Sequence, residues 1–101
     1  MIVAFSVSPS GGDPDGGVSE AVARAVKVVR ESGLPNSTNA MFTNIEGESW
    51  DEVMDVVKRA VEAAGEGSSR VSLVLKADIR PGFSGQLEAK VDRVEARLRE
   101  S

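Results

Sequence analysis

The sequence predicts one α+β domain, in which an antiparallel sheet carries two helices on one face and a further helix follows at the C-terminus. The chain has 101 residues, which suits a single modest core. Its apolar residues alternate with period 2 in some segments and with period 3.6 in others, in the order strand, helix, strand, strand, helix, strand, helix. The βαββαβ part of this order is the ferredoxin-like arrangement. We therefore expect a single ferredoxin-like domain over residues 1–101, with the extra helix at about 86–99.

The first quarter of the chain is expected to form a strand and a helix. Residues 2–8 alternate between apolar and small side chains, as in a half-buried strand, and Pro9 is expected to end it. The glycine- and aspartate-rich stretch 10–17 predicts a loop. A helix should follow, with Ser19 as its N-cap and Gly33 as its stop. Its expected core face is made of residues at helical spacing, namely Val18, Val22, Ala25, Val26 and Val29.

The middle of the chain predicts two short strands and a well-capped helix. Segment 36–48 has room for two strands with a turn near 39–41, and the polar character of the first strand suits a sheet edge. Ser49 and Glu52 form an S-x-x-E capping box, in which each side chain bonds the backbone N–H of the other residue. The helix is expected over 50–64.

The last third predicts a strand at 71–79 and a charged helix with a narrow apolar seam. The seam repeats at 4-3-4 spacing, like a short coiled coil, through Leu87, Val91, Val94 and Leu98. Two heptads are too short to stand alone, so the seam should pack on its own sheet or on another subunit. The sheet face without helices also needs a cover. We therefore expect a homo-oligomer, a dimer or a tetramer.

Composition excludes several function classes. The net charge is −4 and no basic block is present, which disfavours nucleic-acid binding. The chain has no Cys and no His, so thiolate metal sites and catalytic triads are absent. The glycine-rich loop 10–17 matches no phosphate-binding pattern and has no basic residue, unlike the anion loop of ferredoxin-like acylphosphatases. No apolar run approaches the length of a membrane span. We expect a cytoplasmic protein with no catalytic residues, no metal site and no cofactor.

Small polar groups on the predicted strands form the candidate binding site. Single hydroxyls mean little, but several of them beside one carboxylate can orient a ligand in an apolar pocket. Thr43 and Glu46 are three residues apart on one strand, so they should point to opposite faces unless the strand bulges. Trp50 fits either a core anchor at the helix start or a pocket wall. The simpler interpretation of segment 41–53 is a hairpin strand that leads into a capped helix.

Several motifs, in this order, resemble the small thiamine-binding-protein family, the single-domain relatives of the YkoF-type thiamine-binding proteins. They are A-F-S-V-S-P at 4–9, V-S at 18–19, E-S-G-L at 31–34 and M-F-T-N-I-E-G-E-S-W-D-E-V at 41–53. The resemblance covers essentially the whole chain. It implies a ferredoxin-like fold, oligomers that are commonly tetramers, no catalysis, and thiamine or its hydroxymethyl-pyrimidine portion as the ligand.

On this resemblance, the ligand-binding residues would be Ser6, Ser8, Ser19, Met41, Thr43, Glu46 and Trp50. The aminopyrimidine needs apolar walls and hydrogen-bond partners, and the thiazolium cation gains from a carboxylate or an aromatic face. Phe42 stands where the family usually has glycine. The alternative function is an oligomeric ACT-like regulatory or structural module that binds another small metabolite.

Overall fold

The computed structural model describes residues 1–11 and 18–100 of the chain and confirms the ferredoxin-like order of elements. Most of the predicted loop 10–17 lies outside the described residues. The elements are β1 (Ile2–Ser10), α1 (Val18–Glu31), β2 (Asn36–Thr38), β3 (Thr43–Glu46), α2 (Trp50–Ala64), β4 (Arg70–Asp78) and α3 (Gln86–Glu100).

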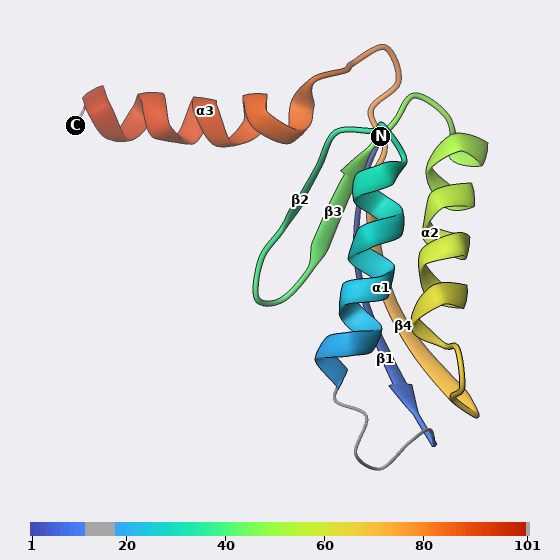
Figure 1. Cartoon of the computed structure of the whole chain (residues 1–101). Coiled ribbons are helices and arrows are strands. Elements are labelled where there is room, and N and C mark those ends of the chain that lie inside the picture. Colours follow the sequence, from blue (N-terminus) through green and yellow to red (C-terminus); the bar gives the residue numbers. More distant parts are fainter. Residues whose placement is uncertain (12–17, 101) are drawn as a thin grey trace.

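The four strands form one antiparallel sheet in the order β2-β3-β1-β4 (Figure 1). The polar strand β2 lies at an edge, as its composition predicts. The two long strands pair along their whole length, from Ile2 with Asp78 to Ser10 with Arg70. Strand β3 pairs with β1 only from Ile2 to Phe5. Beyond Phe5, β4 is therefore the only strand among the described residues that pairs with β1.

The prediction that Pro9 ends the first strand is wrong, because β1 continues through Pro9 to Ser10. Proline has no N–H to donate, so it disrupts a strand that is hydrogen-bonded to neighbours on both sides. It is tolerated where one side of the strand has no neighbour. In this part of β1 the β3 side carries no paired strand, and Pro9 pairs in register with Val71 of β4.

The core lies between the sheet and the two helices α1 and α2, which cover the same face (Figure 1). Val3, Phe5 and Val7 of β1 point into it, and Ile45 of β3 joins them. Alanines on the facing sides of the helices, Ala21, Ala25, Ala60 and Ala64, are all buried. Val18, predicted to be part of the core face of α1, is 55% exposed. The buried stripe of α1 runs instead through Ala21, Ala25 and Val29.

Side chains satisfy both ends of α2. Ser49 is the N-cap, and its hydroxyl accepts a hydrogen bond from the Glu52 N–H at 3.1 Å. The reciprocal half of the predicted capping box is shifted by one residue, because the Glu52 carboxylate accepts from the Glu48 N–H at 3.1 Å. At the other end, the Arg24 guanidinium of α1 donates to the carbonyl oxygens of Ala63 and Ala64, at 2.8 and 3.3 Å. The last turn of α2 has no basic residue of its own. Arg24 therefore supplies the positive charge that stabilises a helix C-terminus.

Helix α3 projects sideways from the domain and does not pack along its own sheet (Figure 1). None of its residues is buried, and Val91 and Val94 of the apolar seam are 57% and 59% exposed. Its attachment depends on Glu46, which is only 4% exposed. The Glu46 carboxylate accepts hydrogen bonds from the backbone N–H groups of Gln86 and Leu87, at 2.9 and 3.0 Å. A carboxylate at this position also favours the positive end of the helix dipole. Among the described residues, no helix is long and apolar enough to cross a membrane.

We expect Glu46→Ala to release the start of α3 without unfolding the domain. The substitution removes both acceptors from the first turn, and charged hydrogen bonds of this kind are worth about 1.5–3 kcal/mol each. The amide hydrogens of Gln86 and Leu87 should then exchange about tenfold faster or more. Hydrogen exchange followed by NMR measures this effect. Glu66→Ala, at an exposed carboxylate, is the control, and unchanged protection in the Glu46 variant would show that α3 is held by other contacts.

Candidate functional site

The candidate site is a cavity of about 200 Å³ between α1, the second half of β1 and the β2–β3 hairpin. It forms because β3 begins only at Thr43, opposite Phe5, while β1 continues to Ser10, so α1 lies over a region that β3 does not fill. From β1 and α1, the lining residues are Phe5, Ser6, Val7, Val22, Ala25 and Val26. From the hairpin they are Thr38, Asn39, Ala40, Met41, Phe42 and Thr43.

The cavity combines apolar walls with one directed hydroxyl. Thr43 pairs with Phe5 and faces the helices, and the residue is 7% exposed. No described residue bonds the Thr43 hydroxyl. Because Thr43 lines the cavity, its hydroxyl can donate a hydrogen bond to a ligand there and accept one from it. Ser6 also lines the cavity, but it pairs with Val74, so its side chain belongs to the face of the sheet without helices.

The tip of the hairpin is held in shape by Asn39. Its side-chain oxygen accepts hydrogen bonds from the N–H groups of Met41 and Phe42, at 2.8 and 2.9 Å. The Asn39 N–H in turn donates to the Phe42 carbonyl at 3.0 Å. These bonds make a side-chain-braced turn of the kind that asparagine favours. Met41 is 73% exposed on this turn, so it lies at the rim of the cavity.

The register places Thr43 and Glu46 on opposite faces of the sheet, as their spacing predicts. Thr43 pairs with Phe5 on the helix face, whereas Glu46 pairs with Ile2 on the other face. The Glu46 carboxylate is occupied by α3 and does not line the cavity that contains Thr43. Of the two polar groups in this motif, only Thr43 is available to a ligand in the cavity.

The structure brings together three of the seven residues predicted for the site, namely Ser6, Met41 and Thr43. Ser19 lies one turn before Val22 on α1 and is exposed outside the cavity. Because α1 begins at Val18, Ser19 is its second residue and not the predicted N-cap. Ser8 is exposed and pairs with Ser72 on the face that carries no helix.

Trp50 is not the predicted core anchor. It is 53% exposed at the first residue of α2, because Val53, Val56 and Val57 fill the core on that side of the helix. Trp50 lines a separate groove of about 570 Å³ beside the loop that follows β4.

Sequence reasoning missed several residues that line the cavity, among them Val22, Val26 and Asn39. Val22 and Val26 were expected to be part of the core face of α1, but both are only partly buried. They lie one position away from the alanine stripe that packs on α2. An asparagine directly after a short strand is a turn signal, and this signal could have marked Asn39 as the residue that shapes the rim.

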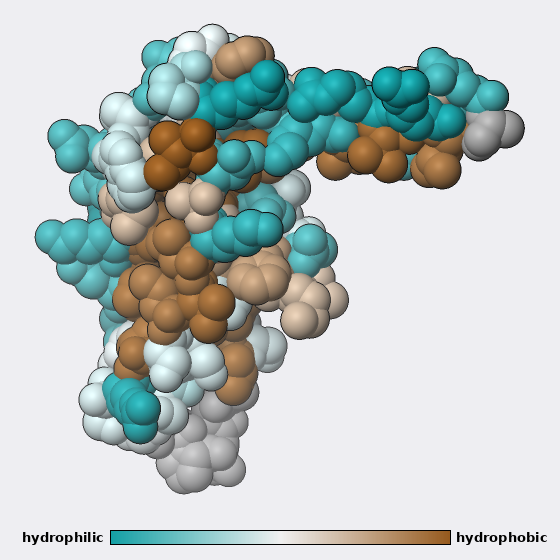
Figure 2. All heavy atoms as spheres, turned by 180° about the vertical axis from the view of Figure 1, so that it is seen from behind, coloured by the Kyte–Doolittle hydropathy of each residue, from teal (hydrophilic) through white to brown (hydrophobic). Residues whose placement is uncertain are grey.

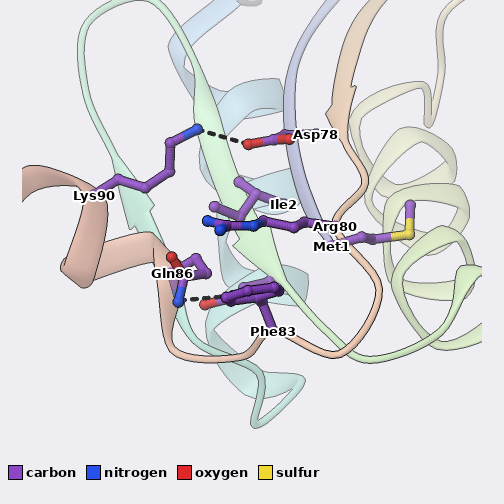
Figure 3. Close-up of a pocket in the computed structure, with 8 residues that line it drawn as sticks. Met1, Ile2, Asp78, Arg80, Phe83, Gln86 and Lys90 are labelled. Carbon is purple, nitrogen blue, oxygen red and sulfur yellow. Dashed lines mark hydrogen bonds and ion pairs between the residues drawn. The ribbon is translucent and has the colours of Figure 1, made fainter.

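A smaller pocket of about 30 Å³ lies where α3 joins the sheet, lined by Asp78, Arg80, Phe83, Gln86 and Lys90 among others (Figure 3). Lys90 donates a 2.6 Å hydrogen bond to the Asp78 carboxylate, and both side chains are about half exposed. The hydrogen bond and the charge of Lys90 lower the pKa of Asp78 below its ordinary value, and Arg80 and Lys76 add smaller contributions. This ion pair joins the second turn of α3 to the end of β4.

Comparison with known proteins finds one matching family model and similar proteins in bacteria and archaea. The family model described as thiamine-binding protein matches residues 3–95. The UPF0045 protein of Mycobacterium bovis is 54% identical over 98 residues, which cover 97% of this chain and 94% of that protein. A solved domain of unknown function from Bacillus cereus is 34% identical, with a TM-score of 0.78 over 89% of this chain and 85% of that one. A solved hypothetical protein from Methanocaldococcus jannaschii is 30% identical, with a TM-score of 0.79 over 93% of this chain and 94% of that one.

Lys90→Gln should raise the pKa of Asp78 toward its ordinary value, because the largest cause of the lowered pKa is removed. In the unaltered chain, the ion pair is complete above the ordinary pKa of an aspartate and is lost as the pH falls through the lower, folded-state value. The carboxyl chemical shift of Asp78, followed by NMR from neutral to acidic pH, gives the midpoint of its titration in the unaltered chain and in the Lys90 variant. Lys76→Gln is the matched control and should move the midpoint less. Equal midpoints in the Lys90 variant and the unaltered chain would contradict the assignment.

Proposed function

The chain belongs to the thiamine-binding protein family, and we propose that it is a cytoplasmic, non-catalytic binding protein for thiamine or its hydroxymethyl-pyrimidine portion. The observation that supports this proposal most strongly is the cavity beside α1, where Ser6, Met41 and Thr43 meet. A mostly apolar cavity with a few directed polar groups is the usual form of a small-molecule site. The absence of His and Cys from the sequence is consistent with binding without chemistry.

The lining favours the pyrimidine as the part of the ligand that enters the cavity. No carboxylate is among the described lining residues, so nothing there balances the charge of the thiazolium. The aminopyrimidine is neutral and flat, and it suits walls of Phe5, Val22 and Val26 with the Thr43 hydroxyl as a hydrogen-bond partner. In this arrangement the thiazolium lies at the rim near Met41.

The size of the cavity supports the same arrangement. Its volume of about 200 Å³ is below the roughly 300 Å³ at which pockets for drug-sized ligands begin. A single six-membered ring fits such a space better than the two linked rings of thiamine. The proposed side-chain contacts are therefore Thr43 and Met41, with Ser6 contributing through its backbone and Asn39 as the residue that fixes the rim.

We expect isothermal titration calorimetry to show saturable binding of hydroxymethyl-pyrimidine and of thiamine, at about one ligand per chain. Thr43→Val keeps the shape of the side chain but removes its hydroxyl, so it should weaken the binding of both ligands by about threefold to tenfold. Ser8→Ala removes a hydroxyl from the opposite face and serves as the matched control. A folded protein that gives no saturable heat with either compound would contradict the proposal and favour an ACT-like module for another metabolite.

We also propose that the chain forms a homo-oligomer, a dimer or a tetramer, through α3 and the open face of the sheet. The open face is the face without helices, and its apolar members include Ile2, Ala4 and Val74. Val74 is 58% exposed there, and the seam residues Val91 and Val94 are also more than half exposed. Figure 2 shows apolar side chains gathered on the body of the domain and along one side of α3. Exposed apolar surface of this extent is typical of a subunit contact.

Val94→Glu should reduce the oligomer to a smaller species, because it places a charge in the middle of the proposed contact. Size-exclusion chromatography with light scattering measures the mass directly. Glu95→Lys alters a neighbouring exposed residue outside the seam and should leave the mass unchanged. A mass equal to that of one chain for the unaltered protein would overturn this proposal while leaving the ligand proposal in place.

A further inference from the structure

A second concave surface lies at the start of α2, and it shares no lining residue with the cavity beside α1. It is a groove of about 570 Å³ between residues 48–50 and the loop 79–84 that follows β4. Three large apolar side chains line it while remaining about half exposed, namely Trp50 (53%), Ile79 (49%) and Phe83 (46%). A cluster of this kind on a small domain marks a binding surface more often than chance exposure.

The loop presents an arginine in a fixed position over an aromatic ring. The Arg80 guanidinium carbon lies 3.6 Å from the centroid of the Phe83 ring, and Figure 3 shows the side chain above the ring. Residues 80–83 form a tight turn in which the Phe83 N–H donates to the Arg80 carbonyl at 3.2 Å. Pro81 and Gly82 occupy its central positions, and Gly82 has a φ of 82°, which is the pattern of a type II turn. The turn thus fixes the backbone at Arg80, and stacking on Phe83 orients its side chain.

The Arg80 guanidinium has no ion-pair partner among the described residues. The ion pairs of the described residues join Arg59 with Asp55, Lys90 with Asp78 and Arg97 with Glu100. Stacking over a ring leaves the edge of a guanidinium, with its N–H donors, available for a carboxylate or a phosphate. Among the described residues, the groove therefore contains a cation without an ion-pair partner that stacks on Phe83, and a second aromatic ring, Trp50.

We propose that this groove binds a planar aromatic molecule that carries a phosphate or carboxylate group. The ring lies against the Trp50 and Phe83 side of the groove, where aromatic and apolar surfaces favour stacking. The anionic group pairs with Arg80; Glu48 is the carboxylate that lines the groove itself, and Asp78 lies near Arg80 in the adjoining pocket. The volume of about 570 Å³ lies within the roughly 300–1,000 Å³ of small-molecule sites. The site is independent of the proposed vitamin cavity.

The single tryptophan of the chain makes this proposal directly testable. Trp50 is the only tryptophan, so its fluorescence reports on this groove and not on the cavity beside α1. We use adenosine monophosphate as the probe, with adenosine as the ring without the anion and ribose 5-phosphate as the anion without the ring. The proposal expects saturable quenching by adenosine monophosphate at lower concentration than by adenosine, and no quenching by ribose 5-phosphate. Equal quenching by adenosine and its monophosphate, or none by either, overturns it.

Two arginine variants test the assignment of the anion partner. Arg80→Gln should weaken the binding of adenosine monophosphate by about tenfold or more, because the charged hydrogen bonds to the phosphate are lost. The affinity for adenosine should stay unchanged. Arg70→Gln, at the opposite end of β4, is the matched control and should change neither affinity. Light scattering of the same samples tests the alternative that the groove is a contact between subunits. If quenching occurs only together with a change in mass, the groove is a contact between subunits and the proposal is overturned.

Discussion

The unequal length of the strands is the constraint on which the rest of the structure depends. β1 and β4 have nine residues each, whereas β2 and β3 have three and four. The pairing of β3 with β1 therefore ends halfway along β1, at Phe5 with Thr43, and only the turn of the hairpin extends beyond it. Helix α1 continues past this point and covers a space that no strand fills, which creates the cavity. The free side of β1 in the same region is also what allows Pro9 to remain in the strand.

The period of the β-strand then divides the polar groups of β3 between two tasks. Successive side chains point to opposite faces, so Thr43 enters the cavity while Glu46 reaches the start of α3. A shift of one residue in the pairing would exchange the two faces and leave a carboxylate in the core. The buried Ile45 between them opposes such a shift, because it packs against Val3 with no exposed surface.

The sequence was sufficient to predict the order of the elements and most of their faces, but not which residues line the cavity. Periodicity and capping located α2 from Trp50 to Ala64, and spacing alone separated Thr43 from Glu46. The same alternation already places Ser8 on the face opposite Phe5, outside the cavity. Trp50 could not be placed in this way, because exposure near a helix start depends on where the core ends. Trp50 is three residues before the fully buried Val53 and shares its side of α2. It remains exposed because it lies one turn before Val53, beyond the end of the core.

Helix α3 is the part of the chain that the isolated domain explains least. Its contacts with the rest of the described chain lie in its first turns, at Glu46 and at the Asp78–Lys90 ion pair. Isolated helices of this length are marginal in water, so a 15-residue helix that buries nothing needs a partner surface. The seam and the open face lie away from α1, whereas the cavity lies beneath it. An assembly formed through α3 and the open face would therefore cover the apolar surface and leave the cavity accessible to its ligand.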